Sequence, residues 1–205
     1  MSQMTVSEMS LLEMTDSHQQ QQHWLSEQVL NWSGVPVTHI RPTVFMEHPM
    51  FFSIPAKTIR ADSTFRLPLG LAKSSPIFAR DVAEAIVAIL VKPSGHAGKA
   101  YELTAGTSDN MDTIAEQFSE VLGRKITYVD VPFDEWKLGL RDDMPEHLFQ
   151  HIEVMIQLHR AGRYDKVFDG FQAILGRKPS TLRDFVLAHP KEFGLALQDP
   201  SSQNP

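Results

Sequence analysis

Three histidines in the last third of the chain are spaced so that they could share one face of a helix. They are His147, His151 and His159, and a His-x-x-x-His pair on a helix can chelate zinc or copper. The stretch lacks the glutamate that follows the first histidine in metalloproteases, and a further ligand would have to come from elsewhere. The chain contains no cysteine, so thiolate ligands and disulfides are excluded. The sequence therefore predicts no metal site.

Composition narrows the class of protein. The 205 residues are 42% hydrophobic and 21% charged, which is typical of a globular domain with its own core. A net charge of −6, with no basic run, argues against direct nucleic-acid binding. The longest apolar stretch, residues 85–91, is too short to cross a bilayer, and the N-terminus has no signal-peptide pattern. These features predict a cytoplasmic protein without a membrane or nucleic-acid partner.

Strand patterns alternate with helical patterns over the first two thirds of the chain. β-branched alternation predicts strands at residues 35–40, 64–68, 99–104 and 125–131. Apolar spacing predicts helices at residues 21–33, 55–60, 78–91, 110–122, 145–161, 167–175 and 182–189. In the first helix Leu25, Gln28, Val29 and Trp32 fall on one face. Strands alternating with helices predict an α/β fold with a parallel component.

The pattern changes to helices alone after Pro132, and this suggests a division of the chain. Residues 1–22 are expected to be a flexible segment and residues 196–205 a tail. Residues 23–132 would form a partial Rossmann-type (doubly wound) sheet, and residues 133–195 a helical cap on the substrate side. Parallel strands need helices on both faces, and the chain begins without an opening strand–turn–helix unit. We therefore expect it to be the C-terminal part of a larger fold.

Three blocks of sequence carry a family resemblance. The first is HWLSEQVLNWSGVPVTHIRPTVFMEH at residues 23–48, and the second is RDVAEAIVAIL at residues 80–90. The third is KAYELTAG from Lys99, followed by IAEQFSEVLGRKITYVDVP from Ile114. In this order they resemble NmrA-like proteins, a group of atypical short-chain dehydrogenases/reductases. The resemblance implies a Rossmann-type fold that binds NADP or NAD.

The glycine-rich turn that grips a dinucleotide is missing from this sequence. In Rossmann-type proteins that turn places the pyrophosphate at a helix N-terminus. Neither G-x-G-x-x-G nor G-x-x-G-x-x-G occurs, and the ribose-phosphate selector that should follow is missing with it. In an alignment to the family the chain starts at or after the fifth core strand. The expectation is that intact relatives use NADP or NAD, whereas this chain alone binds no cofactor.

The resemblance assigns cofactor-side positions but no catalytic residue. The tyrosine and lysine of dehydrogenases in this group are replaced by Gln19 and His23, and a glutamine cannot donate a proton in this chemistry. His23 could hydrogen-bond a ribose, or it could be a surface residue at a helix start. The segment Pro42, Thr43, Val44 and Phe45 would lie against the nicotinamide; a strand end with Phe45 in the core is the structural alternative.

Three further residues are assigned to the substrate side, and one ion pair is expected. Met46, Glu47 and Trp136 would face the substrate, although Trp136 could instead pack the cap. Arg41 and Asp81 are expected to form a buried ion pair that joins strand to helix.

The sequence predicts a reductase-like protein that, when intact, transfers hydride to a quinone or another carbonyl. Its partners would be a small-molecule substrate or a regulated protein. At the open edge of the sheet we expect either a homo-oligomer or a complex with a polypeptide that supplies the missing half of the fold. An NAD(P)-sensing regulator and a non-enzymatic interaction module remain alternatives.

Overall fold

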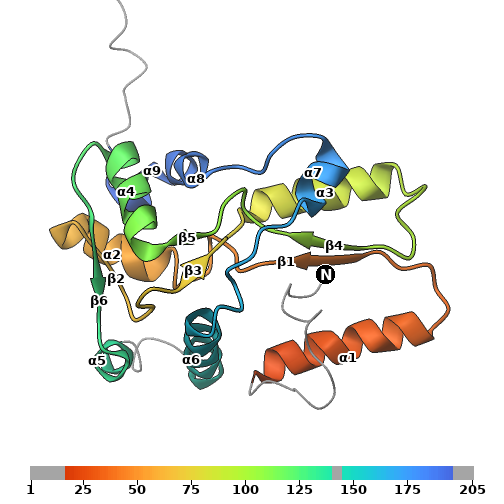
Figure 1. Cartoon of the computed structure of the whole chain (residues 1–205), viewed down its shortest axis with the longest axis horizontal. Coiled ribbons are helices and arrows are strands. Elements are labelled where there is room, and N and C mark those ends of the chain that lie inside the picture. Colours follow the sequence, from red (N-terminus) through yellow and green to blue (C-terminus); the bar gives the residue numbers. More distant parts are fainter. Residues whose placement is uncertain (1–16, 140–144, 196–205) are drawn as a thin grey trace, which may run out of the picture.

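The fold is built around two parallel strand pairs. The computed structural model describes residues 17–139 and 145–195. Strand β1 (His39–Pro42) pairs in parallel with β4 (Ala100–Leu103), and His39 lies opposite Ala100. The pair lies between helix α1 (His18–Trp32) on one side and helices α3 (Ala79–Val91) and α7 (Gly170–Leu175) on the other (Figure 1). The predicted α/β class with a parallel component is confirmed, and the paired strands are those predicted at residues 35–40 and 99–104.

The first strand lies further along the chain than predicted. Residues 35–38 are irregular, and Val35 is exposed. The N–H groups of His39 and Thr43 donate to carbonyls of the β4 side, at Lys99 and Leu103. The nitrogen of Pro42 therefore points to the opposite edge, where a proline costs no ladder bond. The β-branched pattern at residues 35–40 indicated a strand, but the backbone pairing begins only where β4 lies alongside.

The fourth predicted strand does not join this pair. It is β6 (Thr127–Asp130), which pairs in parallel with β2 (Thr64–Leu67). Helices α2 (Ser53–Asp62) and α4 (Met111–Leu122) pack on this second pair. Two short strands missed by the sequence analysis, β3 (Lys73–Ser74) and β5 (Asp109–Asn110), pair antiparallel. Pairing thus follows long-range packing, which strand patterns alone do not encode.

The C-terminal helices pack on both halves of the molecule. They are α5 (Phe133–Leu138), α6 (Glu146–Arg160), α7, α8 (Leu182–Ala188) and α9 (Pro190–Phe193). Helix α7 packs on β4 and α3, whereas α8 packs on α4 and α9 on α2. Two separate apolar clusters form the core, the smaller one around Ile40, Leu103 and Phe171.

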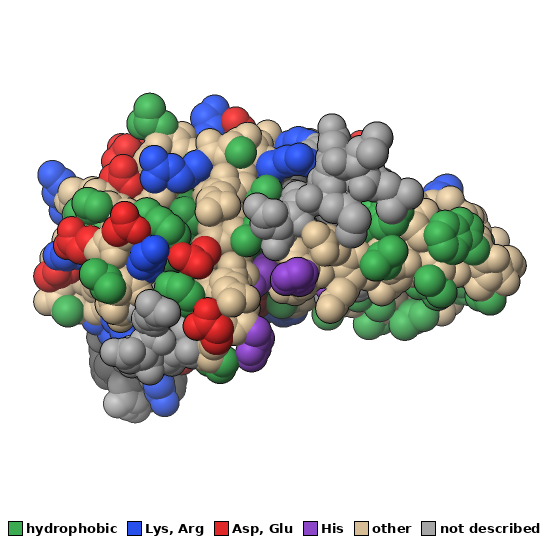
Figure 2. All heavy atoms as spheres, turned by 90° about the horizontal axis from the view of Figure 1, so that it is seen from below, with side chains coloured by type: hydrophobic (Ala, Val, Ile, Leu, Met, Phe, Trp, Pro, Cys, Tyr) green, Lys and Arg blue, Asp and Glu red, His purple; other side chains and the backbone are tan. Residues whose placement is uncertain are grey.

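Helix α1 presents its polar side to the protein and its apolar side outward. It begins at His18, capped by the Ser17 side chain, so the end of the segment predicted to be loop is helical; residues 1–16 lie outside the described part. Gln20 and Glu27 are buried, while the predicted apolar face is exposed, with Trp32 at 76%. Figure 2 shows hydrophobic side chains over the outer surface of this helix. No helix among the described residues is both long and apolar enough to cross a membrane.

Candidate functional site

The loop that follows β1 is held from both sides. The Thr43 N–H donates to the Leu103 carbonyl at 2.8 Å, which ties the loop to β4. The Ile77 N–H donates to the Val44 carbonyl and the Met46 N–H to the Ile77 carbonyl, both at 2.9 Å. This loop leaves the carboxyl end of a parallel strand, where open α/β sheets place their ligands.

Four buried side-chain polar atoms, two of them from this loop, have no hydrogen-bond partner within the described part of the chain. They are Nδ1 of His23, Oγ1 of Thr43, Nε2 of His48 and Nδ1 of His151. They come from α1, the loop that follows β1, and α6. Figure 2 shows histidine side chains between α1 and the rest of the molecule. Leaving a buried polar atom unpaired costs about 1–3 kcal/mol, so a group of four such atoms indicates a place for a ligand or ordered water.

The protonation state of His48 follows from its backbone contact. The Met50 N–H donates to Nδ1 of His48 at 3.3 Å, so this nitrogen carries no proton. Burial, and then the neighbouring His151 and His159, lower the pKa of His48 to about 4. A neutral ring whose Nδ1 accepts must carry its proton on Nε2. His48 therefore presents a buried N–H donor that no described residue accepts.

His151 and His23 complete the group of imidazoles. The rings of His48 and His151 meet edge to face, with centroids 5.8 Å apart. Burial lowers the pKa of both His151 and His23, and the proximity of His23 lowers the pKa of His151 further. Three neutral rings near one another can donate or accept hydrogen bonds, but they offer no positive charge.

His159 has a different role although it follows on the same helix. Its Nδ1 donates to the Met155 carbonyl at 2.7 Å, so Nε2 accepts from the Ser74 hydroxyl at 3.1 Å. The ring is fully buried, stacks on Tyr164, and has a pKa lowered by burial to about 4. Both nitrogens are satisfied, which makes His159 a structural residue. Within the described ranges no three acidic or histidine side chains are arranged to hold a metal ion.

Of the predicted cofactor-side residues, His23 and Thr43 each have a buried side-chain atom without a hydrogen-bond partner in the described ranges. Pro42 and Val44 are buried at the strand end, and Val44 belongs to the larger apolar cluster. Phe45 bridges to Ile77 and packs against the smaller cluster. Both the backbone role and the core role considered for this segment are compatible with that placement.

The three residues predicted for the substrate side have different surroundings. Met46 is buried and lines a cavity of about 510 Å³, together with Phe51 and Phe118. Both carboxylate oxygens of Glu47 accept from the Ala79 N–H at 3.1 Å, so this side chain is bound to the first turn of α3. Trp136 is buried in the larger apolar cluster.

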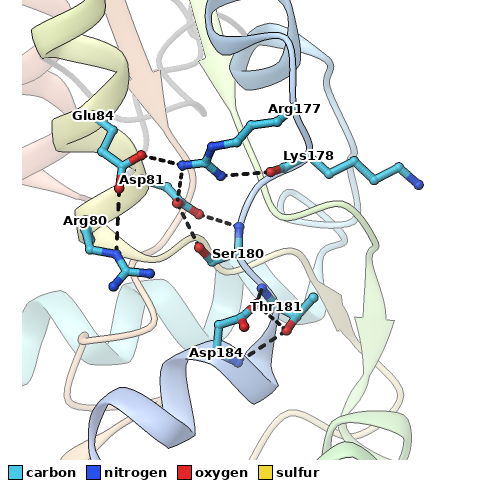
Figure 3. Close-up of polar contacts among 8 residues, drawn as sticks. All are labelled: Arg80, Asp81, Glu84, Arg177, Lys178, Ser180, Thr181 and Asp184. Atoms are coloured by element: carbon cyan, nitrogen blue, oxygen red, sulfur yellow. Dashed lines mark hydrogen bonds and ion pairs between the residues drawn. The ribbon is translucent and has the colours of Figure 1, made fainter.

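The expected ion pair between Arg41 and Asp81 does not form. Arg41 instead binds Glu27 of α1, with Nε–Oε1 at 3.0 Å, and lies 3.8 Å from Glu102. Asp81 is fully buried and accepts from the Ser180 N–H at 2.6 Å and from its hydroxyl at 2.9 Å. Figure 3 shows this carboxylate between α3 and the segment that leads into α8. The prediction identified two charged residues that form ion pairs or hydrogen bonds inside the fold but paired them wrongly, because packing decides which partners distant in sequence meet.

Sequence analysis did not assign His48, and it considered His151 only as a metal ligand. A usable signal was present: His48 lies close after the cofactor-side segment, in the loop that follows a predicted strand. The position of His151 opposite it depends on how α6 packs, which helical spacing does not reveal.

The fold is that of an α/β protein of the Rossmann type. The profile of the NmrA-like family matches residues 13–186, and the chain belongs to that family. It is 32% identical over 184 residues to an NAD(P)H azoreductase of Xenophilus azovorans, covering 88% of this chain and 63% of that protein.

Two solved structures share the fold. The triphenylmethane reductase of Citrobacter sp., complexed with NADP(H), superposes with a TM-score of 0.74 at 20% identity, covering 91% of this chain and 62% of that one. An NADPH-dependent quinone oxidoreductase from Escherichia coli, complexed with NADPH, gives 0.74 at 18% identity, covering 92% and 63%. The chain thus spans about three fifths of the length of these relatives.

Proposed function

We propose that this chain forms the nicotinamide and substrate side of an NAD(P)H-dependent reductase that transfers hydride to a quinone or another carbonyl. The observation that carries the proposal is that four buried side-chain atoms, from α1, the loop that follows β1, and α6, have no hydrogen-bond partner among the described residues. Membership of a family that includes reductases acting with NAD(P)H agrees with it.

The residues present fit one end of the cofactor. His23 Nδ1 and Thr43 Oγ1 are polar atoms that could hydrogen-bond the ribose and carboxamide of a nicotinamide nucleotide. No glycine-rich turn for the pyrophosphate occurs in this sequence, and that turn contributes much of a dinucleotide's affinity. When bound, the reduced nicotinamide supplies a hydride. The chain's own contribution is to orient that end and to exclude water around it.

The proposal is tested by comparing two cofactors on the purified chain. Reduced nicotinamide mononucleotide contains the ring and ribose but no dinucleotide pyrophosphate. We expect it to bind about as weakly as NADPH, because the additional half of NADPH finds no glycine-rich turn here. Calorimetry measures both affinities, and loss of reduced-nicotinamide absorbance with menadione present measures reduction. The proposal is refuted if neither nucleotide binds at high concentration and no oxidation occurs even when the part of a relative that this chain does not span is supplied in trans.

A regulatory role is the second candidate, and one observation favours it. Leu25, Val29 and Trp32 form an exposed apolar row on α1, and such a row is typical of a protein-binding face. In this role the nucleotide would bind at the same atoms but would control contact with another polypeptide. A partner that binds with an affinity dependent on NADPH, without any reductase activity, would favour regulation over catalysis.

A further inference from the structure

The chemical nature of the donor at this site points to a more specific role, which rests on the proposed reductase function. We infer that His48 donates a hydrogen bond through its Nε2–H to the substrate atom on which negative charge develops, and that the site selects neutral acceptors. The Met50 N–H donates to Nδ1 of His48, so the proton of the neutral ring is on Nε2. This Nε2 has no partner in the described ranges.

The ring acts as a hydrogen-bond donor and not as an acid. A neutral imidazole with its proton on Nε2 keeps that proton while it stabilises a neighbouring oxygen or nitrogen. In the reduction the acceptor gains one hydride, that is, one proton and two electrons, and its double bond to oxygen or nitrogen becomes single. The electron pair of that bond moves to the oxygen or nitrogen beside His48, and water supplies the proton that completes the product.

The charges around the loop account for the preference for neutral substrates. The guanidinium of Arg41 is taken up by Glu27 and Glu102, and the carboxylate of Glu47 is bound at the start of α3. The four unpartnered atoms themselves belong to three imidazoles and one hydroxyl. An anionic group buried among them would lose its hydration without gaining a counter-charge, which is costly. A planar quinone or azo compound without a charge has acceptor atoms and requires no such compensation.

Two substitutions at His48 test whether an N–H donor at the Nε2 position, and not the imidazole ring as such, is what the substrate needs. His48→Gln places an amide N–H near the position of Nε2, whereas His48→Asn reaches only the position of Nδ1. The probe is menadione, added without nucleotide to histidine-labelled protein and followed by nitrogen NMR of the imidazoles. We expect the Nε2 signal of His48 to shift and that of His159 to stay unchanged, because both nitrogens of His159 are already bound within the protein. Menadione should bind His48→Asn about 3- to 10-fold more weakly than His48→Gln, the loss of one net hydrogen bond.

A sulfonated quinone of similar ring size tests the charge preference, and we expect it to bind about 10-fold more weakly than menadione. Equal menadione affinity in the Asn and Gln variants, with both folded by their melting curves, overturns the donor assignment. Tighter binding of the sulfonated quinone overturns the charge preference. If the His48 signal shifts but no nucleotide is oxidised, even with the in-trans part of a relative present, the reductase function is refuted and the donor assignment stands. If nucleotide is oxidised but the His48 signal does not shift, the reductase function stands and the donor assignment is refuted.

Discussion

Acid should destabilise this protein through His159, and the size of the effect can be worked out from its surroundings. The ring is fully buried, with Nδ1 on the Met155 carbonyl and Nε2 on the Ser74 hydroxyl. Its pKa is lowered from 6.5 to about 4 by burial. Between these values the unfolded chain binds the proton and the folded protein does not, so stability rises with pH across that window and is lost as the pH falls through it. At about 1.4 kcal/mol per pKa unit, the loss from about pH 7 to about pH 4 is about 3 kcal/mol.

The assay is urea unfolding of the wild type, His159→Asn and His147→Asn across this pH range. Asparagine keeps an amide that can donate to the Met155 carbonyl but cannot be titrated. We expect His159→Asn to be less stable near neutral pH, and its deficit to shrink by about 3 kcal/mol as the pH falls to about 4. His147 is exposed on the same helix, and His147→Asn is the control for losing a histidine as such. If His159→Asn is less stable than the wild type by the same amount at every pH, the buried His159 ring does not have the lowered pKa that this prediction assumes.

Three further predictions follow from contacts described above. Asp81→Asn should cost about 2 kcal/mol in urea unfolding, because the buried carboxylate accepts two hydrogen bonds from Ser180 and charged acceptors contribute more than neutral ones; an unchanged midpoint would contradict this. Gly170→Ala should cost about 1–3 kcal/mol by overpacking, because a Cβ there would lie 2.4 Å from the Glu102 carbonyl oxygen; wild-type stability would show that the backbones separate freely. The pure chain should sediment as a dimer or larger, and Trp32→Ser should shift it toward monomer. The reason is that the Trp32 side chain is 76% exposed on an apolar face, which is typical of an interaction surface. A wild-type monomer would exclude self-association through that face.

Much of the local structure could be predicted from the sequence, because its causes are local. The helix predicted at residues 110–122 is α4, which Asn110 caps and Gly123 ends in the left-handed conformation. The apolar spacing of α3 likewise predicted its buried face, with Val82, Ala85 and Ile89 inside. Caps, turns and helical faces depend on neighbours within about one helical turn, so they can be identified from the order of residues.

Partners that lie far apart in sequence were decided only by the tertiary structure. The apolar row of α1 predicted a buried face, yet Glu27 turns inward because it neutralises Arg41. Asp81 could be recognised as a charged residue in an apolar helix, but its partner Ser180 lies 99 positions away. In the candidate site, too, some features were visible in the sequence and others were decided by packing. The strand end at residues 42–45 was visible from the sequence, whereas the imidazole of His151 reaches His48 only because α6 packs against the loop after β1. A pattern along the chain shows which residues need a partner, and packing determines which partner they find.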